Sequence, residues 1–242
     1  MAEPLAPLTV NRCTVSPVPL FTPRRIDVPE LLDEHDAPRA DMERSLRDLR
    51  RFNRYFGGTG VYRRLLRRMA PDRSKRLVII DLGAGTADLL DSLRDYRDLL
   101  AVGMDVNIGH LLYLRDGSRA QRVVGDATRL PFRNGGADVV TSAHFFHHFA
   151  PEENATILGE ALRVARRGAI VNDTRRHYVP LAVVKAMAAL RVVGRITRND
   201  APASIRRGYT IAEAREIGAR VRARRLEAVR AWPFRFGLLL WR

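Results

Sequence analysis

Between residues 76 and 174, short runs rich in Val, Ile and Leu alternate with stretches that have helical spacing. The apolar runs predict five strands, at 76–82, 99–106, 121–127, 137–143 and 168–174. Helices are expected between them at 86–96, 107–117 and 151–168, with a long one at about 177–195 after the fifth strand. Strands and helices that alternate at this spacing predict a parallel, doubly wound α/β sheet.

The chain on either side of this region has its own patterns. Upstream, apolar residues recur every three or four positions from Met42 to Phe56 and predict a helix that Gly57 and Gly58 end. Downstream, 226–232 and 234–242 predict two closing strands in an antiparallel pair. We therefore expect a Rossmann-like, mostly parallel seven-stranded sheet with an antiparallel last strand and an N-terminal helical cap.

This reading divides the chain into three parts. A Pro-rich irregular leader is expected over 1–25, a helical cap over 26–72, and the α/β domain over 73–242, with a helical lid segment at 177–210. The leader lacks the pattern of a signal peptide, and a single cysteine, Cys13, excludes an internal disulfide. No stretch approaches the roughly 20 apolar residues of a membrane span. We expect a cytoplasmic protein without stable membrane insertion, although weak membrane contact by 178–194 remains open.

The net charge of +15 first suggests a nucleic-acid partner. However, Lys75 and Lys185 are the only lysines among 42 basic residues, and the arginines are scattered along the chain. Such a bias is typical of genome base composition rather than of a binding patch. We therefore do not expect a nucleic-acid partner, and an RNA-modifying enzyme is kept only as the alternative.

Acidic residues and glycines mark the carboxyl ends of the first three predicted strands, where open α/β sheets bind their ligands. Asp81 is followed by Gly83, Ala84 and Gly85, and the next two strands end at Asp105 and Asp126. Asp105 lies 20 residues after Gly85. This is the spacing at which an acidic side chain reaches a ribose hydroxyl. A nucleoside-containing ligand is predicted, unless the aspartates merely cap the helices that follow.

A dinucleotide fits these residues poorly. The third glycine of its fingerprint is replaced by Asp88, and Asp81 and Asp88 would flank the pyrophosphate. A phosphate-binding loop fails as well, because no Gly-Lys-Ser/Thr follows the glycines. Three carboxylates favour a nucleoside that carries positive charge. S-adenosylmethionine fits, with Asp81 toward its ammonium group, Asp105 toward the ribose and Asp126 toward the adenine amino group.

The segments VIIDLGAGTAD, VGMDV, VVGDATRLPF and ADVVTSAHFFHHF resemble the successive motifs of class I S-adenosylmethionine-dependent methyltransferases. The resemblance covers about 75–175, and GDATRLPF is similar to the quinone and small-molecule branch. It implies that Asp126 and Ala127 hold the adenine and that Val106 packs on the adenosine. RSLRDLRRFNRYFGG and VNDTRRHYVP are similar to methyltransferases associated with polyketide synthases. The expected cofactor site comprises Asp81, Gly83, Ala84, Gly85, Asp105, Val106, Gly125, Asp126, Ala127 and Ser142.

The turn after the fourth strand faces the methyl group and narrows the choice of acceptor. It lacks the Asn/Asp-Pro-Pro-Tyr/Phe pattern of amino-group enzymes, and no cysteine lies near it for cytosine chemistry. It carries His144, His147 and His148 instead. Adjacent histidines do not easily converge on one ion, so no metal is expected, and His148 alone can be a packing residue. We predict His144 or His147 as the general base for O-methylation of a phenolic or quinol hydroxyl.

The acceptor is expected to be a small aromatic molecule bound under the helical cap. Phe56, Phe146, Arg175 and Arg176 are the candidate binding residues, although each also has a purely structural interpretation. The methylated atom stays open between oxygen, carbon and nitrogen. Besides the RNA alternative, a nicotinamide-dependent oxidoreductase and a non-catalytic module that keeps the cofactor fold remain as rival hypotheses.

Overall fold

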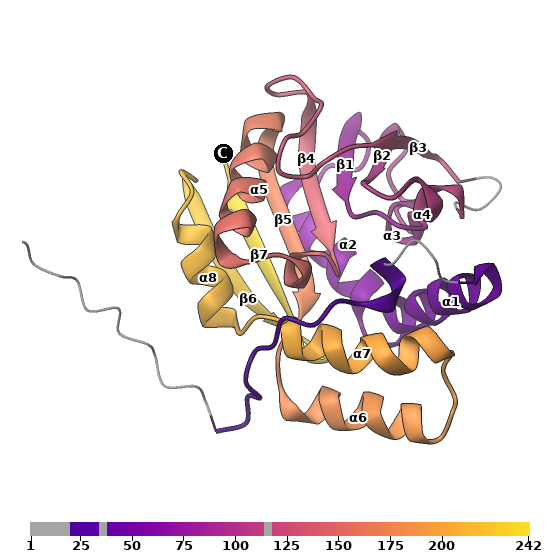
Figure 1. Cartoon of the computed structure of the whole chain (residues 1–242). Coiled ribbons are helices and arrows are strands. Elements are labelled where there is room, and N and C mark those ends of the chain that lie inside the picture. Colours follow the sequence, from indigo (N-terminus) through magenta and orange to yellow (C-terminus); the bar gives the residue numbers. More distant parts are fainter. Residues whose placement is uncertain (1–19, 34–37, 114–117) are drawn as a thin grey trace, which may run out of the picture.

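The computed structural model describes residues 20–33, 38–113 and 118–242, which build one seven-stranded sheet in the order β3-β2-β1-β4-β5-β7-β6 (Figure 1). The strands are β1 (Leu77–Leu82), β2 (Leu99–Asp105), β3 (Ala120–Val124), β4 (Ala137–Ala143), β5 (Ala165–Thr174), β6 (Arg225–Ala231) and β7 (Arg235–Trp241). β1 to β5 pair in parallel, β7 is antiparallel to β5, and β6 is antiparallel to β7. The predicted Rossmann-like sheet is confirmed.

Helices cover both faces of the sheet and the edge beyond its strand ends. They are η1 (Leu31–Asp33), α1 (Arg39–Tyr55), α2 (Gly58–Met69), α3 (Asp88–Asp91), α4 (Ile108–Leu112), η2 (Phe146–His148), α5 (Pro151–Val164), α6 (Tyr178–Ala189), α7 (Arg195–Arg207) and α8 (Ile211–Ala219). Successive strand residues point to opposite faces. Accordingly Ile79 joins the core under α2, whereas Ile80 joins the core under α5 and α8.

Several element boundaries differ from the sequence prediction. α5 ends at Val164 and β5 begins at Ala165, three residues before the expected strand. Gly168 suggested a helix end, but it lies inside β5 opposite Trp241. A Cβ there would stand 2.0 Å from the Leu240 carbonyl oxygen, so a glycine lets β7 approach closely. α3 spans only Asp88–Asp91 instead of the expected 86–96.

The expected long helix at about 177–195 is two helices. α6 ends at Ala189, Arg191 adopts a left-handed conformation with φ of 54°, and α7 begins at Arg195. α6 and α7 pack side by side beyond the carboxyl ends of the strands, and α1 packs against α7 (Figure 1). These three helices therefore cover the edge of the sheet where ligands are expected.

The N-terminal segment, defined here as residues 20–33, runs across η2 and α7 and ends in η1. Arg176 Nη1 donates to the Pro23 carbonyl at 2.8 Å, Arg25 Nε donates to the Arg207 carbonyl at 2.8 Å, and Arg207 Nη1 donates to the Val28 carbonyl at 3.1 Å. Most of the expected leader, with Cys13, lies outside the described residues. Among the described residues, no helix has the length and apolar character needed to cross a membrane.

Candidate functional site

The turn between β1 and α3, which we call the glycine turn, is shaped for close approach of a ligand. Gly83 and Gly85 have φ of 64° and 51°, a region that favours glycine, and Ala87 shares it at 53°. A Cβ on Gly83 would lie 2.1 Å from the Phe145 ring, so Gly83 allows the turn to pack on that ring. A Cβ on Gly85 would meet no atom within 4 Å. The backbone at Gly85 therefore borders open space.

Asp105, at the end of β2, is held next to this turn. Its Oδ2 accepts a hydrogen bond from the Gly85 amide at 3.2 Å, and its Oδ1 accepts one from the Asn107 amide at 2.9 Å. The following residue, Val106, is 74% exposed. An uncovered valine beside a fixed carboxylate suits the apolar face and the hydroxyls of a nucleoside.

Asp81 is buried at the end of β1, where it accepts a hydrogen bond from Thr141 Oγ1 at 2.6 Å. Burial, together with the negative charge of Asp88, raises its pKa to about 7 against the lowering effect of the Thr141 hydrogen bond. A buried carboxylate with no cation beside it is costly. Asp81 therefore fits a ligand that brings a positive charge.

The remaining predicted cofactor residues lie at the same edge. Gly125 donates from its amide to the Asp105 carbonyl at 3.1 Å, and Asp126 accepts from the Thr128 amide and hydroxyl, each at 2.8 Å. Ala127 and Ser142 are 6% and 5% exposed. The structure thus brings the predicted set together at the carboxyl ends of β1 to β4, while their contacts with a ligand stay predictions.

A cavity of about 250 Å³ lies under α1, α6 and α7, close to this edge. Most of its wall is apolar, comprising Leu32, Leu49, Phe52, Phe56, Pro180, Val183, Val184, Ala201, Ile205, Trp232, Pro233 and Phe234. Such a wall suits an apolar molecule of modest size.

Polar groups from three strands meet at one end of the cavity. His144 follows β4, Thr174 ends β5 and Arg235 begins β7, and all three line the cavity. Arg235 is 3% exposed; its Nε donates to the Phe56 carbonyl at 3.0 Å and its Nη2 donates to His144 Nε2. Its Nη1 has no hydrogen-bond partner among the described residues. We call His144, Thr174 and Arg235 the polar floor.

The polar floor determines the protonation state and the tautomer of His144. Burial lowers the pKa of His144 well below its usual value, and the Arg235 charge lowers it further. Because a guanidinium only donates, Nε2 of His144 must accept, and the ring proton is therefore on Nδ1. Nδ1 lies 3.5 Å from Thr174 Oγ1. His144 is thus a neutral imidazole whose lone pair is already engaged.

Asn53 of α1 connects the polar floor to the glycine turn. Its Oδ1 accepts from Arg235 Nη2 at 3.4 Å, and its Nδ2 donates to Asp88 Oδ2 at 3.3 Å. Sequence reasoning missed Arg235 and Thr174 as site residues. It also treated Asp88 only as a departure from the family pattern. No motif marks Arg235, because only the reversed direction of β7 brings it to this edge.

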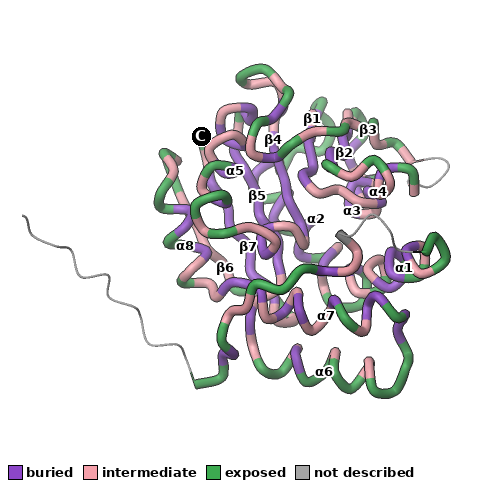
Figure 2. The backbone as a smooth tube through the Cα atoms, in the orientation of Figure 1, coloured by how far each residue is buried: buried purple, intermediate pink, exposed green. Residues whose placement is uncertain are grey.

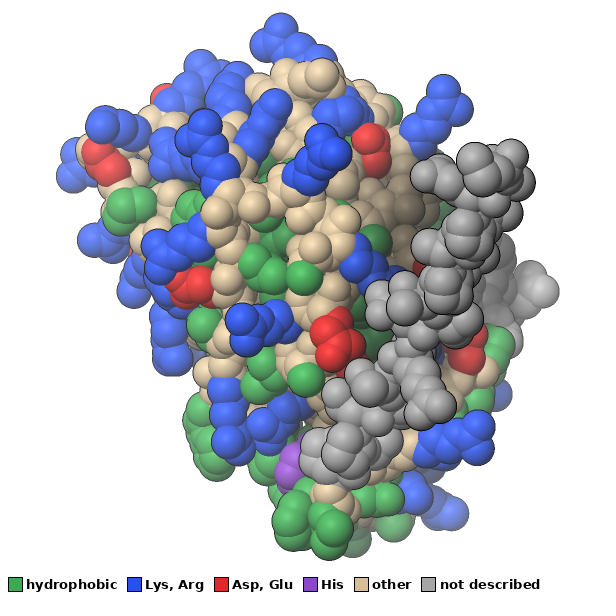
Figure 3. All heavy atoms as spheres, turned by 90° about the vertical axis from the view of Figure 1, so that its left-hand side faces the viewer, with side chains coloured by type: hydrophobic (Ala, Val, Ile, Leu, Met, Phe, Trp, Pro, Cys, Tyr) green, Lys and Arg blue, Asp and Glu red, His purple; other side chains and the backbone are tan. Residues whose placement is uncertain are grey.

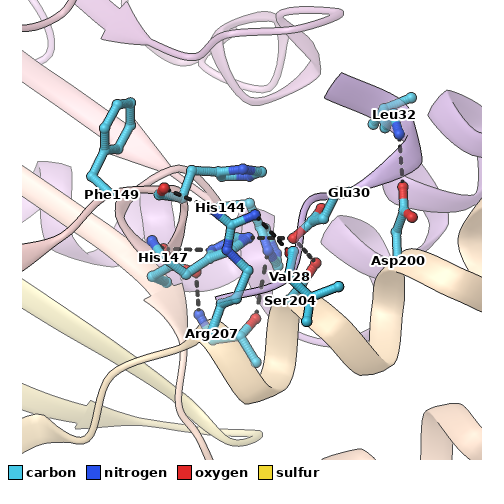
Figure 4. A network of polar contacts seen from close by, with 12 residues as sticks. Val28, Glu30, Leu32, His144, His147, Phe149, Asp200, Ser204 and Arg207 are labelled. Carbon is cyan, nitrogen blue, oxygen red and sulfur yellow. Dashed lines mark hydrogen bonds and ion pairs between the residues drawn. The ribbon is translucent and has the colours of Figure 1, made fainter. Parts of the chain in front are cut away.

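His147 lies behind the polar floor in a buried ionic group (Figure 4). Its Nδ1 is 2.9 Å and 3.0 Å from the two Asp173 carboxylate oxygens, and its Nε2 is 3.4 Å from Glu30 Oε1. Burial alone would lower the pKa of His147, but the Asp173 and Glu30 carboxylates raise it to about 10. A cationic His147 holds its proton at neutral pH, which favours a structural role over that of a base.

Glu30, His147 and His148 also place possible metal-ligand atoms within 4.8 Å of one another. An ion there would have to displace the proton that Asp173 and Glu30 stabilise on His147. The adjacent rings of His147 and His148 are tilted by 33°, with centroids 4.3 Å apart. The proton that Asp173 and Glu30 stabilise on His147 favours an ionic group over a metal site.

Of the four residues predicted to bind the acceptor, only Phe56 lines the cavity. Phe56 lines the cavity and is 39% exposed. Phe146 is buried in the core against Tyr209 and Phe236, and buried Arg176 donates to the Gly208 carbonyl at 3.0 Å. Arg175 stacks over Phe234, with its guanidinium carbon 5.5 Å from the ring centre.

Comparison with known proteins identifies the domain. Residues 80–171 match the sequence model of a family described as Methyltransferase domain. Residues 80–171 therefore carry the sequence pattern of a methyltransferase domain. A curated relative, demethylmenaquinone methyltransferase of Roseiflexus sp. (strain RS-1), is 37% identical over 97 residues. The match covers 38% of this chain and 40% of the relative, so it spans well under half of either protein.

Solved structures share the fold of this methyltransferase domain. One is an S-adenosylmethionine-dependent methyltransferase of Methanococcus maripaludis, described as putative, with a TM-score of 0.57, 12% identity and coverage of 86% of this chain and 95% of the other. The plantazolicin methyltransferase BpumL has a TM-score of 0.61, 11% identity and coverage of 83% and 90%. Magnesium protoporphyrin IX methyltransferase of Synechocystis PCC 6803, solved with S-adenosylhomocysteine, has a TM-score of 0.53, 16% identity and coverage of 77% and 84%.

Proposed function

We propose that this protein transfers the methyl group of S-adenosylmethionine to a small, apolar aromatic acceptor, at a phenolic or quinol oxygen. The observation that carries the proposal is the cavity, whose wall is mostly apolar and contains the polar floor together with Glu30, Ser45, Thr197, Asp200 and Ser204. The polar floor lies at the same edge of the sheet as the glycine turn. An aromatic body would fill the apolar part, and its hydroxyl would be directed toward the floor and the cofactor.

The residues of the glycine turn fit this cofactor. The buried carboxylate of Asp81 would lie near the ammonium group of the cofactor. Asp105 would lie near its ribose, next to the exposed Val106. When bound, S-adenosylmethionine supplies an electrophilic methyl group on a sulfonium centre. The protein has to hold the acceptor oxygen in line with that group, because methyl transfer is accelerated mainly by proximity and orientation.

Arg235 gives the polar floor a charge that favours a phenolate. Burial lowers its pKa to about 10, with Asp173 acting against this, so the guanidinium stays charged at neutral pH. A cation beside a phenol lowers the phenol pKa. His144 donates from Nδ1 and has no lone pair for the acceptor proton in this arrangement. We therefore assign His144 and Arg235 to binding the acceptor oxygen, in place of the predicted general base.

The named acceptors of similar proteins support the size and chemistry of this substrate. The Roseiflexus relative is a demethylmenaquinone methyltransferase, and the Synechocystis enzyme acts on magnesium protoporphyrin IX. Both names describe molecules that contain ring systems.

The test is a methyl-transfer assay with labelled S-adenosylmethionine and a panel of apolar phenols and quinols, with products identified by mass spectrometry. Arg235→Gln should lower kcat/KM by about 100-fold, since a buried charged hydrogen bond is worth about 1.5–3 kcal/mol. Arg225→Gln, an exposed arginine on β6, is the matched control and should keep full activity. Affinity for S-adenosylhomocysteine should be the same in all three proteins. Full turnover by Arg235→Gln would contradict the assignment.

A further inference from the structure

α6 presents an apolar surface that the other described residues leave uncovered. Leu181 is its only buried residue, and it packs chiefly on α7 among the described elements. Along the outer side, Val179 is 46% exposed and Leu190 is 74% exposed. Figure 2 shows α6 as the outermost helix, with much of its length exposed. An apolar helix that buries so little of itself needs another occupant.

Aromatic side chains from two other segments extend this surface. The Tyr178 amide donates to the Phe21 carbonyl at 3.0 Å, which places the N-terminal segment at the start of α6. Trp232, in the turn between β6 and β7, is 79% exposed and lies 6.2 Å from Phe234, ring centre to ring centre. We call this combined surface the α6 face; its members are Phe21, Tyr178, Val179, Val183, Leu190 and Trp232.

The charge around the α6 face has one sign. From Arg175 to Asn199 the sequence contains no Asp or Glu, while Lys185 and Arg191 lie on and just after α6. Arg230 is exposed at the end of β6, close enough to lower the pKa of His177 together with Arg175, after the effect of burial. Figure 3 shows hydrophobic side chains gathered at the lower end of the molecule with Lys and Arg nearby.

We propose that the α6 face docks on an anionic lipid bilayer. Apolar and aromatic side chains bordered by basic residues are the features of surfaces that lie in the headgroup region without crossing the membrane. Tryptophan and tyrosine favour this boundary. The occupant is lipid rather than a second copy, because two α6 faces would bring their uncompensated cations together.

Docking would also give the cavity an entrance from the bilayer. Val183 and Trp232 belong both to the α6 face and to the cavity wall. An apolar acceptor dissolved in lipid would enter without crossing water. The entrance for the acceptor rests on the proposed function, whereas the docking of the α6 face does not. An experiment can therefore contradict one without contradicting the other.

The test is co-sedimentation of the full chain with vesicles of phosphatidylcholine and with vesicles that also contain phosphatidylglycerol. We expect binding to the anionic vesicles and a blue shift of tryptophan emission as Trp232 leaves water. Val179→Glu/Leu190→Glu should weaken this binding at least tenfold at an unchanged melting temperature, because both side chains are exposed. The control Gln121→Glu/Thr156→Glu makes the same change of charge at exposed positions on β3 and α5 and should keep binding.

Three outcomes would overturn the docking. The wild-type chain could fail to sediment with either vesicle. The two double variants could lose binding equally, which would assign it to net charge rather than to the α6 face. Finally, the wild-type chain could form a dimer that only Val179→Glu/Leu190→Glu dissociates, without binding vesicles, which would identify a second copy as the occupant. Methyl transfer to a water-soluble phenol is unaffected by any of these results.

Discussion

The guanidinium of Arg235 donates a hydrogen bond to Nε2 of His144. This contact joins the first residue of β7 to the residue that follows β4, although 91 positions separate them. It decides how the proposed reaction uses its histidine. A lone pair that already accepts from a guanidinium cannot take up the proton of an acceptor. In the proposed reaction His144 would therefore orient the acceptor, which would give its proton to water and bind as an anion beside Arg235.

His144→Gln should therefore lower kcat by about tenfold, the effect of losing one orienting hydrogen bond of about 1.4 kcal/mol. The shape of the pH–rate profile around neutral pH should not change, because burial and Arg235 hold the pKa of His144 well below its usual value. General-base catalysis would instead predict a loss of about 100-fold or more and the disappearance of an acidic limb. Measuring kcat/KM against pH for both proteins distinguishes the two roles.

The ionisation of the Asp81 carboxyl group should make cofactor binding depend on pH. Its pKa of about 7 in the free protein means that it is mostly protonated at pH 6 and mostly ionised at pH 8. An ammonium group binds the ionised form, so S-adenosylhomocysteine should bind about tenfold more tightly at pH 8 than at pH 6. Calorimetric titration at both pH values checks this. Asp81→Asn should abolish the dependence, whereas Asp105→Asn should weaken binding at both pH values and keep the ratio.

The ionic group around His147 should affect stability at alkaline pH. The pKa of His147 is raised from 6.5 to about 10 in the folded state by Asp173 and Glu30. A group with a raised pKa stabilises the fold fully below its unfolded-state pKa, and this contribution is lost as the pH rises through the folded-state pKa. The free energy of unfolding should thus decrease between about pH 6.5 and pH 10.

His147→Gln should cost about 3–5 kcal/mol at pH 6, because it leaves two buried carboxylates without their cation. It should also flatten the alkaline decrease. His177→Asn is the matched control, since His177 is more exposed and Asn retains the ability to cap α6. Urea unfolding at several pH values provides the measurement. An unchanged alkaline decrease in His147→Gln would show that another group causes it.

Filling the cavity should separate acceptor binding from cofactor binding. Ala201 of α7 lines the cavity, and Ala201→Phe would occupy much of its 250 Å³. We expect KM for the acceptor to rise about tenfold or more, because loss of apolar contacts costs about 1–3 kcal/mol. Affinity for S-adenosylhomocysteine should stay the same. Ala212→Phe, on the exposed side of α8, serves as the control, and equal effects of both variants would remove the cavity from the acceptor site.

Local sequence patterns were sufficient to predict the strands of the sheet and the positions of the residues expected to bind the cofactor. The apolar runs located all seven strands, and Asp81, Asp105 and Asp126 lie at the strand ends where alternation of strands and helices predicted them. Helix ends were less predictable, because Arg191 interrupts a continuous apolar pattern with a left-handed turn. The residues expected to bind the cofactor could be located at one edge of the sheet because they follow their strands closely, and their contacts with a ligand stay predictions.

The residues around the proposed acceptor cavity could not be predicted from local sequence patterns. Arg235 reaches the polar floor only because β7 runs opposite to its neighbours, and Glu30 meets His147 across 117 positions. Burial also decided the roles of Phe146 and Arg176, whose residue types suit a binding site as well as a core. Such contacts depend on tertiary packing, and no spacing in the sequence encodes them.

The reversal of β7 has a consequence for how this enzyme can change over evolution. The cofactor is expected at loops that follow β1 to β3, whereas the cavity is lined from both ends of the chain, by η1 and α1 and by α6, α7 and the β6–β7 hairpin. The lining residues are encoded outside the stretch from β1 to β3. Selection can therefore alter the proposed acceptor pocket without changing the residues of that stretch that are expected to hold the methyl donor.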